Sequence, residues 1–341
     1  MYPMKTLTCL APGHFAYQER DEPTPEPGHA LLRIRRVGIC GTDLHAYEGT
    51  QPFFSYPRIL GHELAADLVA VDGDTPCRVG DAVTVMPYLH CGHCIACRMG
   101  KTNCCATMRV LGVHVDGGMR TYLSVPTHTL LPGQGLSYDA LALVEPLAIG
   151  AHGVRRADVQ PGEVVLVVGA GPIGLGVMAF AREAGATVIA LDINEDRLTF
   201  CREQVGVAHT INARSADVAG QLHSLTGGDM PTVVIDATGS LRAIDQGFAY
   251  LAHGGRYVLV GLQKEAITVS HPEFHKREAT LMSSRNATRL DFDHVIRAMK
   301  AGTVDPLPFI THRVSFDEVA QEFPGWLDPT RGVIKAMVSL P

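Results

Sequence analysis

Four cysteines within one short segment are the residues best suited to chemistry. Cys91, Cys94, Cys97 and Cys105 have the spacing C-x2-C-x2-C-x7-C, which suits tetrahedral ligation of one zinc ion. A closed site with four thiolates leaves no coordination position for a substrate, so we expect this zinc to be structural. Disulfides are disfavoured because the spacing is that of a metal site and nothing indicates secretion. An iron–sulfur cluster is the remaining alternative.

A second set of possible metal ligands is spread along the chain. Cys40, the pair His62 and Glu63, and Glu145 supply thiol, imidazole and carboxylate groups. A cysteine, a histidine and a carboxylate can hold zinc and leave a fourth position open for an alcohol oxygen, as catalysis requires. Glu145 stands in the apolar run 141–149, where an ionised side chain needs a metal or a charged partner. Taken singly, each residue also has a simpler interpretation as a buried thiol, a hydrogen-bonded histidine, or a helix cap or ion-pair residue.

A glycine-rich turn follows the buried-strand pattern at residues 164–168. Gly169, Gly171 and Gly174 form G-x-G-x-x-G, which permits a tight turn, close approach of a pyrophosphate and packing of a helix on the strand. Asp192 ends the next strand pattern, where a carboxylate accepts hydrogen bonds from ribose hydroxyls and repels a 2′-phosphate. The sequence therefore predicts NAD binding. The alternative is an ordinary strand–helix turn in which Asp192 caps the next helix.

The elements that must position these residues change in character along the chain. The first 150 residues contain short β-type runs between Gly, Pro and Asp turns, which predicts a β-rich, barrel-like domain. After residue 162 strand and helix patterns alternate, which is typical of a doubly wound parallel sheet. We expect strands at residues 30–37, 65–71, 82–87, 164–168, 187–191, 233–235, 257–260 and 333–338, and helices that end near 184, begin at 195 and cover 290–299.

Length and composition limit the class of protein. A chain of 341 residues exceeds the usual size of one hydrophobic core, so we expect two domains. A net charge of −6 gives no electrostatic basis for binding nucleic acid, so the partner is expected to be a small molecule. The uncharged run 164–181 reaches transmembrane length, but glycines and a proline interrupt it, so no membrane span is expected. The first 22 residues lack a signal-peptide pattern and the other cysteines are scattered, which predicts a cytoplasmic protein.

The sequence resembles the zinc-dependent medium-chain alcohol and polyol dehydrogenases over nearly its whole length. The resemblance implies an α/β protein with a β-rich, GroES-like catalytic domain (residues 1–149 and 286–341) and a doubly wound Rossmann NAD-binding domain (residues 150–285). It also implies one catalytic and one structural zinc per chain, and a homo-oligomer that is a dimer or a tetramer. The matching segments are residues 38–45, 61–63, 80–81, 91–105, 145–146 and 169–174.

By this resemblance, Cys40 and His62 are ligands of the catalytic zinc. Glu63 and Glu145 are carboxylates that ligate the metal or exchange on it, and the sequence leaves open which of them binds at rest. A glutamate at position 145, where simple alcohol dehydrogenases have a cysteine, indicates the branch of sorbitol, threonine and sugar dehydrogenases.

The same resemblance assigns roles to three residues that follow Cys40. Thr42 and His45, with a ribose hydroxyl between them, match a relay that carries the released proton to water, and histidine has a suitable pKa for this task. Asp43 is expected to hold His62 in the tautomer that binds metal. Alternatively, Thr42 and Asp43 are turn residues without a chemical role.

Further cofactor contacts are expected beside the glycine turn and in loops that follow later strands, where nicotinamide contacts gather in this fold. Glycine-turn neighbours and loop residues both contribute to this set. The residues are Pro172, Ile173, Arg197, Thr238, Val260, Gly261, Leu262, Ser284 and Arg285.

The substrate is suggested by segments 51–60, 111–119 and 271–288, which look like the bacterial branch that contains L-galactonate 5-dehydrogenase and related sugar-acid or polyol enzymes. We therefore expect oxidation of a secondary alcohol on a sugar acid or polyol by NAD. A substrate carboxylate needs a cation, for which His114, Lys276 and Arg285 are candidates. The alternatives are a zinc-free quinone or enone reductase, and a non-catalytic NAD-binding regulatory protein.

Overall fold

The computed structural model describes residues 4–24, 26–52 and 54–341, so residues 1–3, 25 and 53 are outside the description. One of these, Phe53, belongs to the segment 51–60 named above. The chain divides into two compact units. The first unit comprises Met1–Pro146 and Thr288–Pro341, and the second comprises Leu147–Ala287. The units divide at 146/147 and 287/288, whereas the sequence predicted domain boundaries at 149/150 and 285/286.

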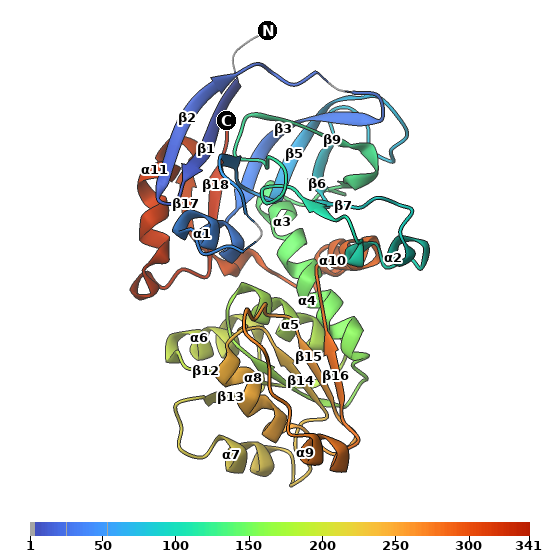
Figure 1. Ribbon diagram of the computed structural model, residues 1–341, viewed down its shortest axis with the longest axis vertical. Coiled ribbons are helices and arrows are strands. Elements are labelled where there is room, and N and C mark those ends of the chain that lie inside the picture. Colours follow the sequence, from blue (N-terminus) through green and yellow to red (C-terminus); the bar gives the residue numbers. More distant parts are fainter. Residues whose placement is uncertain (1–3, 25, 53) are drawn as a thin grey trace. The chain divides into compact units, whose positions relative to one another are not determined.

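The first unit is built around a seven-stranded, mostly antiparallel sheet (Figure 1). Its strand order is β10-β6-β5-β3-β18-β17, and β9 also pairs with β3. The two strands nearest the C-terminus, β17 and β18, run parallel to each other, and β18 pairs antiparallel with β3 from the N-terminal part of the chain. The strands are β3 (His29–Gly38), β5 (Glu63–Val71), β6 (Ala82–Val85), β9 (Tyr122–Pro126), β10 (Leu130–Pro132), β17 (Ile310–Ser315) and β18 (Lys335–Ser339).

Smaller elements complete the first unit. A three-stranded sheet has the order β2-β1-β4, and β7 pairs with β8 beside the cysteine-rich segment. A core of buried Leu, Ile and Val side chains fills the space between the sheets and is closed by Phe316, Phe323 and Trp326. The strands are β1 (Met4–Ala11), β2 (His14–Arg20), β4 (Arg58–Ile59), β7 (Tyr88–Leu89) and β8 (Arg109–Val110), and the helices are α1 (Gly41–Glu48), α2 (Ile95–Arg98), α3 (Tyr138–Ala142), α10 (Arg289–Ala301) and α11 (Val319–Glu322).

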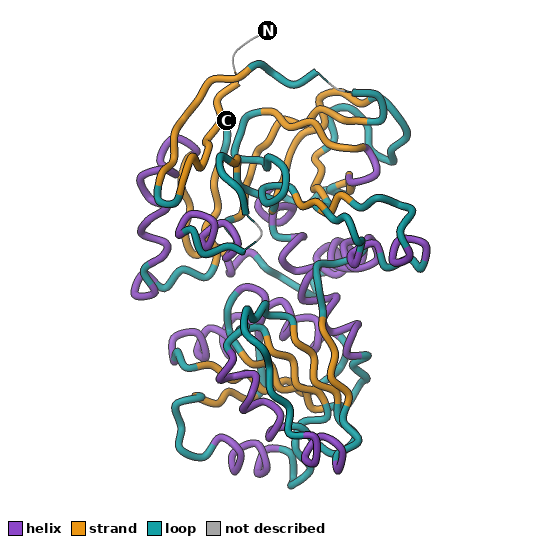
Figure 2. The backbone as a smooth tube through the Cα atoms, viewed as in Figure 1, coloured by secondary structure: helices purple, strands orange, loops and turns teal. Residues whose placement is uncertain are grey.

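The second unit is a six-stranded parallel sheet with helices packed against it (Figure 2). The strand order is β13-β12-β11-β14-β15-β16. The chain adds β12 and β13 on one side of β11 and then returns to add β14, β15 and β16 on the other side, so the switch point lies between β11 and β14. Such a switch point creates a binding crevice at the carboxyl ends of the strands. The strands are β11 (Val164–Val168), β12 (Thr187–Asp192), β13 (His209–Asn212), β14 (Val233–Asp236), β15 (Arg256–Leu259) and β16 (Thr280–Ser283).

The helices of this unit follow the strands in alternation. Helix α4 (Val144–Ala157) leads into the unit, and a π-helical turn (Cys201–Val205) continues α6. The strand interiors are continuous apolar runs because helices cover them, and Leu166, Ile189 and Val234 are fully buried. The other helices are α5 (Pro172–Glu183), α6 (Glu195–Phe200), α7 (Val218–Leu225), α8 (Leu241–Gly247) and α9 (His271–Lys276).

The expected fold class is confirmed, with a β-rich unit and a parallel-sheet unit. The strand expected at 65–71 begins two residues earlier, at Glu63, and the one expected at 82–87 ends at Val85. Helices α1 and α4 were not predicted, although both carry candidate site residues. No helix within the described residues has the length and apolar character needed to span a bilayer.

Candidate metal and dinucleotide sites

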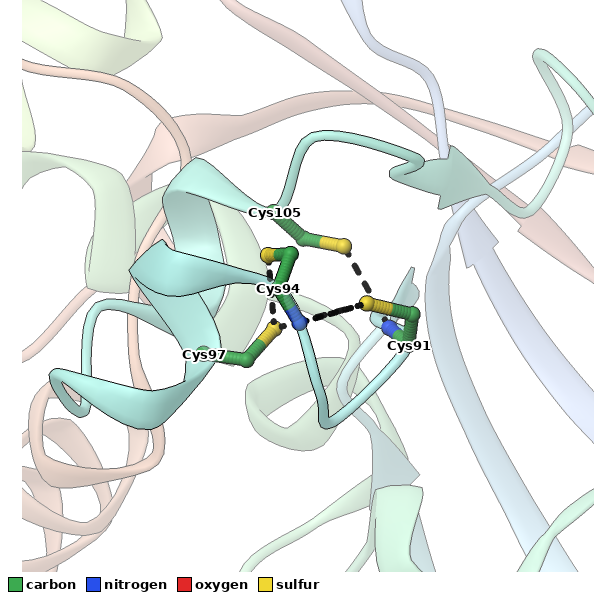
Figure 3. A group of neighbouring side chains, drawn as sticks. All are labelled: Cys91, Cys94, Cys97 and Cys105. Carbon is green, nitrogen blue, oxygen red and sulfur yellow. Dashed lines mark hydrogen bonds between the residues drawn. The ribbon is translucent and has the colours of Figure 1, made fainter.

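The four cysteines come together as their spacing predicts. One potential ligand sulfur from each lies within 4.8 Å of the others, and Figure 3 shows the four side chains turned toward one another. Cys91 follows β7, Cys94 and Cys97 belong to the cap and body of α2, and Cys105 follows a 3-10 turn. All four are free thiols, and Sγ of Cys94 lies 3.5 Å from Sγ of Cys97.

Backbone N–H groups around this cluster favour thiolates. The N–H of Cys94 donates to Sγ of Cys91, and the N–H of Cys91 donates to Sγ of Cys105, both at 3.3 Å. Hydrogen bonds from the backbone at His93 and Cys94 lower the pKa of Cys91 to about 5. Four convergent sulfurs with N–H donors fit a structural zinc.

The second metal cluster is positioned by the pairing of β3 with β5. Gly38, the last residue of β3, is opposite Glu63, the first residue of β5. This register places Cys40 and His62, just beyond the two strand ends, next to each other. Ligand atoms of Cys40, His62 and Glu63 lie within 4.8 Å of one another. A Cβ atom on Gly38 would lie 2.1 Å from Oε2 of Glu63, so only glycine leaves room for this carboxylate.

Asp43 connects the segments that carry the two ligands. Its Oδ2 accepts from the N–H of Cys40 at 2.9 Å, and its Oδ1 accepts from the N–H of Gly61 at 3.2 Å. Oδ1 also faces Nδ1 of His62 at 3.8 Å. Burial opposes the charged form of His62, but the charge of Asp43 and a hydrogen bond with Cys40 outweigh it and raise the pKa of His62 well above its usual value.

Glu63 of this cluster and Glu145, which interacts with it electrostatically, are both buried, and each has a partner that the sequence did not reveal. Both oxygens of Glu63 accept from Nζ of Lys335, at 2.5 and 2.7 Å. Oε1 of Glu145 accepts from the hydroxyl of Tyr88, whereas Oε2 is buried and has no partner among the described residues. Burial raises the pKa of Glu145 to about 7, with a further contribution from Glu63. An apolar run that contains a lysine, at residues 333–338, is the signal that could have revealed Lys335.

The charges and donors of this cluster fit a bound cation. Three buried carboxyl groups, from Asp43, Glu63 and Glu145, are accompanied by the ammonium of Lys335 and by the imidazole of His62, whose pKa is raised. Excess negative charge away from water is costly unless a cation or protons offset it. A thiol, an imidazole and a carboxylate with an unused oxygen are the donors of an open zinc site.

The expected proton relay is only partly assembled. Thr42 and His45 are one turn apart on α1, and the side chain of His45 is 59% exposed. Nδ1 of His45 lies 3.3 Å from Oγ1 of Thr50 and 3.4 Å from a carboxylate oxygen of Glu48. The position of His45 is therefore suited to proton exchange with water, while a link to Thr42 stays a prediction.

The glycine turn joins β11 to α5 as the sequence predicts. Gly169 has φ +99°, a backbone conformation that favours glycine, and Gly171 is the N-cap of α5, which begins at Pro172. A Cβ on Gly174 would lie only 1.8 Å from the carbonyl oxygen of Gly169, so this glycine permits the helix to pack on the turn. The free N–H groups at the start of α5 form a site suited to a phosphate group.

Asp192 lies beside this turn. Its Oδ2 accepts from the N–H of Ala170 at 2.6 Å, and its Oδ1 accepts from the N–H of Asn194 at 2.8 Å. Arg197, from α6, also reaches the turn, and its Nη1 would be 3.8 Å from a Cβ on Gly171. The carboxylate is thus fixed next to the glycine turn.

The remaining cofactor candidates follow the carboxyl ends of three parallel strands. Thr238 follows β14, and its Cγ2 would be 2.8 Å from a Cβ on Gly169. Gly261 packs against Gly239, and a Cβ on Gly261 would lie 2.2 Å from the backbone nitrogen of Gly239. The hydroxyl of Ser284 is buried and has no partner among the described residues. The set is Thr238, Val260, Gly261, Leu262, Ser284 and Arg285.

The three candidates for a substrate carboxylate contact have different local surroundings. Lys276 is in α9, which precedes the amino end of β16, and it pairs with Glu273 at 2.8 Å. His114 accepts the N–H of Val110 through Nδ1 within a local turn. Arg285 is exposed after the carboxyl end of β16. The substrate contact therefore stays a prediction for all three residues.

Both units match known protein families. Residues 26–135 match the alcohol dehydrogenase GroES-like domain, and residues 172–301 match the zinc-binding dehydrogenase family. The chain is 43% identical over 343 residues to L-galactonate-5-dehydrogenase of Escherichia coli K12, covering 99% of this chain and 100% of that protein. The chain belongs to the zinc-binding alcohol dehydrogenases. The sequence-based expectation of an enzyme of this class is thereby confirmed.

Other relatives of this dehydrogenase agree in class and fold. The chain is 32% identical to a sorbitol dehydrogenase of Halalkalibacterium halodurans, over 92% of this chain and 94% of that protein. The crystal structure of the RspB alcohol dehydrogenase from Escherichia coli CFT073, complexed with NADH, superposes with a TM-score of 0.92 at 31% identity and covers 99% of both chains. Zinc and a nicotinamide nucleotide are thus confirmed as cofactors of the class.

Proposed function

We propose that this dehydrogenase oxidises a secondary alcohol of a sugar acid or polyol, with an L-galactonate-like aldonate as the leading candidate, and uses NAD as the acceptor. The observation that carries the proposal is the cluster of Cys40, His62 and Glu63, with the buried carboxyl group of Glu145 in electrostatic contact with His62. The substrate class is supported by the 43% identity to an L-galactonate dehydrogenase along the whole chain.

The side chains of the metal cluster would have different roles in the reaction. Bound zinc supplies a Lewis acid that lowers the pKa of an alcohol, and bound NAD supplies the hydride acceptor. Cys40, His62 and one of the two glutamates would hold the metal. Oδ1 of Asp43 lies 3.8 Å from Nδ1 of His62, a charge contact rather than a hydrogen bond, and with Asp43 on this side Nε2 would be left for ligation.

NAD would bind at the glycine turn of the second unit. The N-terminus of α5 receives the pyrophosphate at Gly171, and the Asp192 carboxylate accepts hydrogen bonds from the adenosine ribose. The same carboxylate disfavours a 2′-phosphate, so NAD is preferred to NADP. Thr42 and His45 would pass the alcohol proton to water, because His45 is exposed on α1.

We further propose that the units act as a catalytic domain (residues 1–149 and 286–341) and a dinucleotide-binding domain (residues 150–285). The protein is proposed to be a cytoplasmic homo-oligomer, either a dimer or a tetramer. Analytical ultracentrifugation of the zinc-loaded protein measures this directly, and a monomer would contradict it.

A substrate panel tests the proposed function. Zinc-loaded protein is mixed with NAD and, separately, with aldonates, polyols and simple alcohols, and NADH formation is recorded. We expect the highest kcat/KM with an aldonate or polyol and a lower value with simple alcohols. Absence of NADH with every member of the panel would contradict the proposal. NADP in place of NAD serves as the control for the role of Asp192.

A further inference from the structure

Asp236 is a buried acidic residue at the carboxyl end of β14, the strand that lies next to β11 across the switch point of the parallel sheet. Its side chain is 0% exposed. No lysine, arginine or histidine pairs with it in the part of the chain that the structure describes. A buried carboxylate without a cation depends on hydrogen-bond donors, so the groups that donate to Asp236 show what it holds in place.

The donors come from the loop that follows β14. Oδ1 of Asp236 accepts from the N–H groups of Thr238 and Gly239, both at 3.0 Å, and the hydroxyl of Thr238 donates to Oδ2 at 2.9 Å. The same hydroxyl accepts from the N–H of Ser240, the N-cap of α8, at 3.0 Å. Burial raises the pKa of Asp236, and the hydrogen bonds from Gly239 and Thr238 act against this rise. The carboxylate therefore fixes the path of this loop, including the left-handed backbone of Gly239 at φ +63°.

The main chain of Asp236 connects this loop to the one that follows β15. Its carbonyl oxygen accepts from the N–H groups of Val260 and Gly261, at 2.8 and 3.1 Å. The two loops are in contact, because Gly261 packs on Gly239 without room for a Cβ between them. One residue thus holds the loops at the carboxyl ends of two neighbouring strands.

These loops lie on the opposite side of the switch point from Asp192. A dinucleotide bound to a doubly wound sheet crosses the switch point, with one nucleoside on each side of the glycine turn. Asp192 ends β12, which is on one side of β11, and its carboxylate is suited to the adenosine ribose. Strands β14 and β15 are on the other side, so their loops would receive the nicotinamide nucleoside.

We propose that Asp236 is a positioning residue that pre-forms the nicotinamide half of the cofactor site. It acts through the loops after β14 and β15 rather than by touching the cofactor, because its carboxylate is buried and its oxygens are used within the first loop. The proposal rests on the proposed function only in requiring NAD at this crevice.

Loss of the carboxylate should weaken one half of the site and spare the other. Without it the N–H groups of Thr238 and Gly239 lose their acceptor, and the loop adopts other conformations. If about 1 to 10% of molecules keep the binding conformation, the Kd of NADH rises by about 10- to 100-fold. ADP lacks the nicotinamide nucleoside, so it binds the loop states equally and its Kd should not change.

The test measures the Kd of NADH and of ADP for zinc-loaded protein without substrate, by titration calorimetry. Three substitutions remove the acceptors of Asp236 in steps. Asp236→Asn keeps an oxygen for both N–H groups and should bind NADH with nearly the wild-type Kd. Asp236→Ser keeps one acceptor and Asp236→Ala keeps none, so the Kd of NADH should rise in the first and rise further, by about 10- to 100-fold, in the second.

A matched control removes a carboxylate at the opposite edge of the same sheet. Both oxygens of Glu163, just before β11, accept from Nη2 of Arg256, the first residue of β15, at 2.7 and 2.6 Å. Glu163→Gln should lower the thermal stability and leave the ratio of the two Kd values unchanged. This variant separates a general loss of stability from a loss of loop position.

Hydrogen exchange reports on the loop itself. In the folded Asp236 variants, the amides of Thr238 and Gly239 should exchange faster than in the wild-type protein, in the order Asn, Ser, Ala. The amides of the glycine turn should exchange at the wild-type rate. If Asp236→Ala does not fold, Asp236→Ser gives both the exchange rates and the two Kd values.

The proposal fails if folded Asp236→Ala, or Asp236→Ser in its place, binds NADH with the wild-type Kd. It also fails if NADH and ADP are weakened equally, since that result indicates loosening of the whole unit. A Kd of NADH in Asp236→Asn as high as in Asp236→Ala would show that the negative charge matters and the loop geometry does not. Wild-type protein that binds neither NADH nor ADP would refute the proposed function as well, whereas the other three results leave it intact.

Discussion

Replacing Gly171 with alanine should separate cofactor binding from folding. The backbone at Gly171 has φ −78°, which alanine adopts without strain, and the nearest atom to an added Cβ is Nη1 of Arg197 at 3.8 Å. Alanine is a poorer N-cap than glycine by roughly 0.5 to 1 kcal/mol, but it also lowers the entropy of the unfolded chain by a similar amount. We therefore expect the free energy of unfolding to change by less than about 0.5 kcal/mol.

The effect on NAD should be much larger. The added methyl group would occupy the position from which a pyrophosphate reaches the backbone N–H groups of the turn. A hydrogen bond to a charged group contributes about 1.5 to 3 kcal/mol, so losing one raises the NAD Kd by about 10- to 150-fold. Titration calorimetry measures the Kd, and thermal unfolding without cofactor measures stability.

Two neighbouring glycines provide the comparison. A Cβ on Gly174 would lie 1.8 Å from the carbonyl oxygen of Gly169, so Gly174→Ala forces the turn apart and should cost about 3 kcal/mol of stability or more. A Cβ on Gly176 meets nothing closer than 3.4 Å, so Gly176→Ala should leave NAD affinity unchanged and raise stability by about 0.5 to 1 kcal/mol, because alanine is the better residue inside a helix. Unchanged NAD affinity in Gly171→Ala would refute the assignment of this turn to the pyrophosphate.

Two further predictions concern the metal sites. Cys97→Ser removes one of four convergent sulfurs, so it should lower the thermal stability and reduce the zinc content by one ion per chain. Hydride transfer should survive in the folded fraction. Full stability with complete loss of activity would contradict the structural role. Rebinding of zinc to metal-free protein near pH 7 should release protons, because the raised pKa of His62 keeps the ring protonated and the pKa of Glu145 is about 7. The apparent zinc affinity should therefore rise with pH until it passes the raised pKa of His62, and equal heats of binding in buffers of different ionisation enthalpy would argue against this.

Local patterns were sufficient for much of the fold and for the candidate ligands. The glycine turn and the four-cysteine segment depend on neighbours in sequence, so their spacing carries the information. Glu145 was found because a carboxylate in an apolar run needs a partner. Helix α1 escaped prediction because it is short and lacks an apolar face, and its start is fixed by the bond from the N–H of Cys40 to Asp43.

The partners of the two glutamates could not be predicted from local patterns. Lys335 is 272 positions from Glu63, and the pairing of β18 with β3 is what brings them together. Tyr88 and Glu145 are 57 positions apart and meet through side chains alone. Sequence spacing contains no signal for such contacts, because they depend on how separate strands and helices pack.

Transfer of deuterium is the most direct test of the proposed reaction. The active substrate from the panel, deuterated at the alcohol carbon, is converted by zinc-loaded protein, and the reduced nicotinamide is analysed by mass spectrometry. We predict one deuterium per reduced nicotinamide with the wild-type protein, and no conversion with His62→Ala that still binds NAD. Reduced nicotinamide without deuterium, or full activity of His62→Ala, would contradict a zinc-dependent hydride transfer at this cluster.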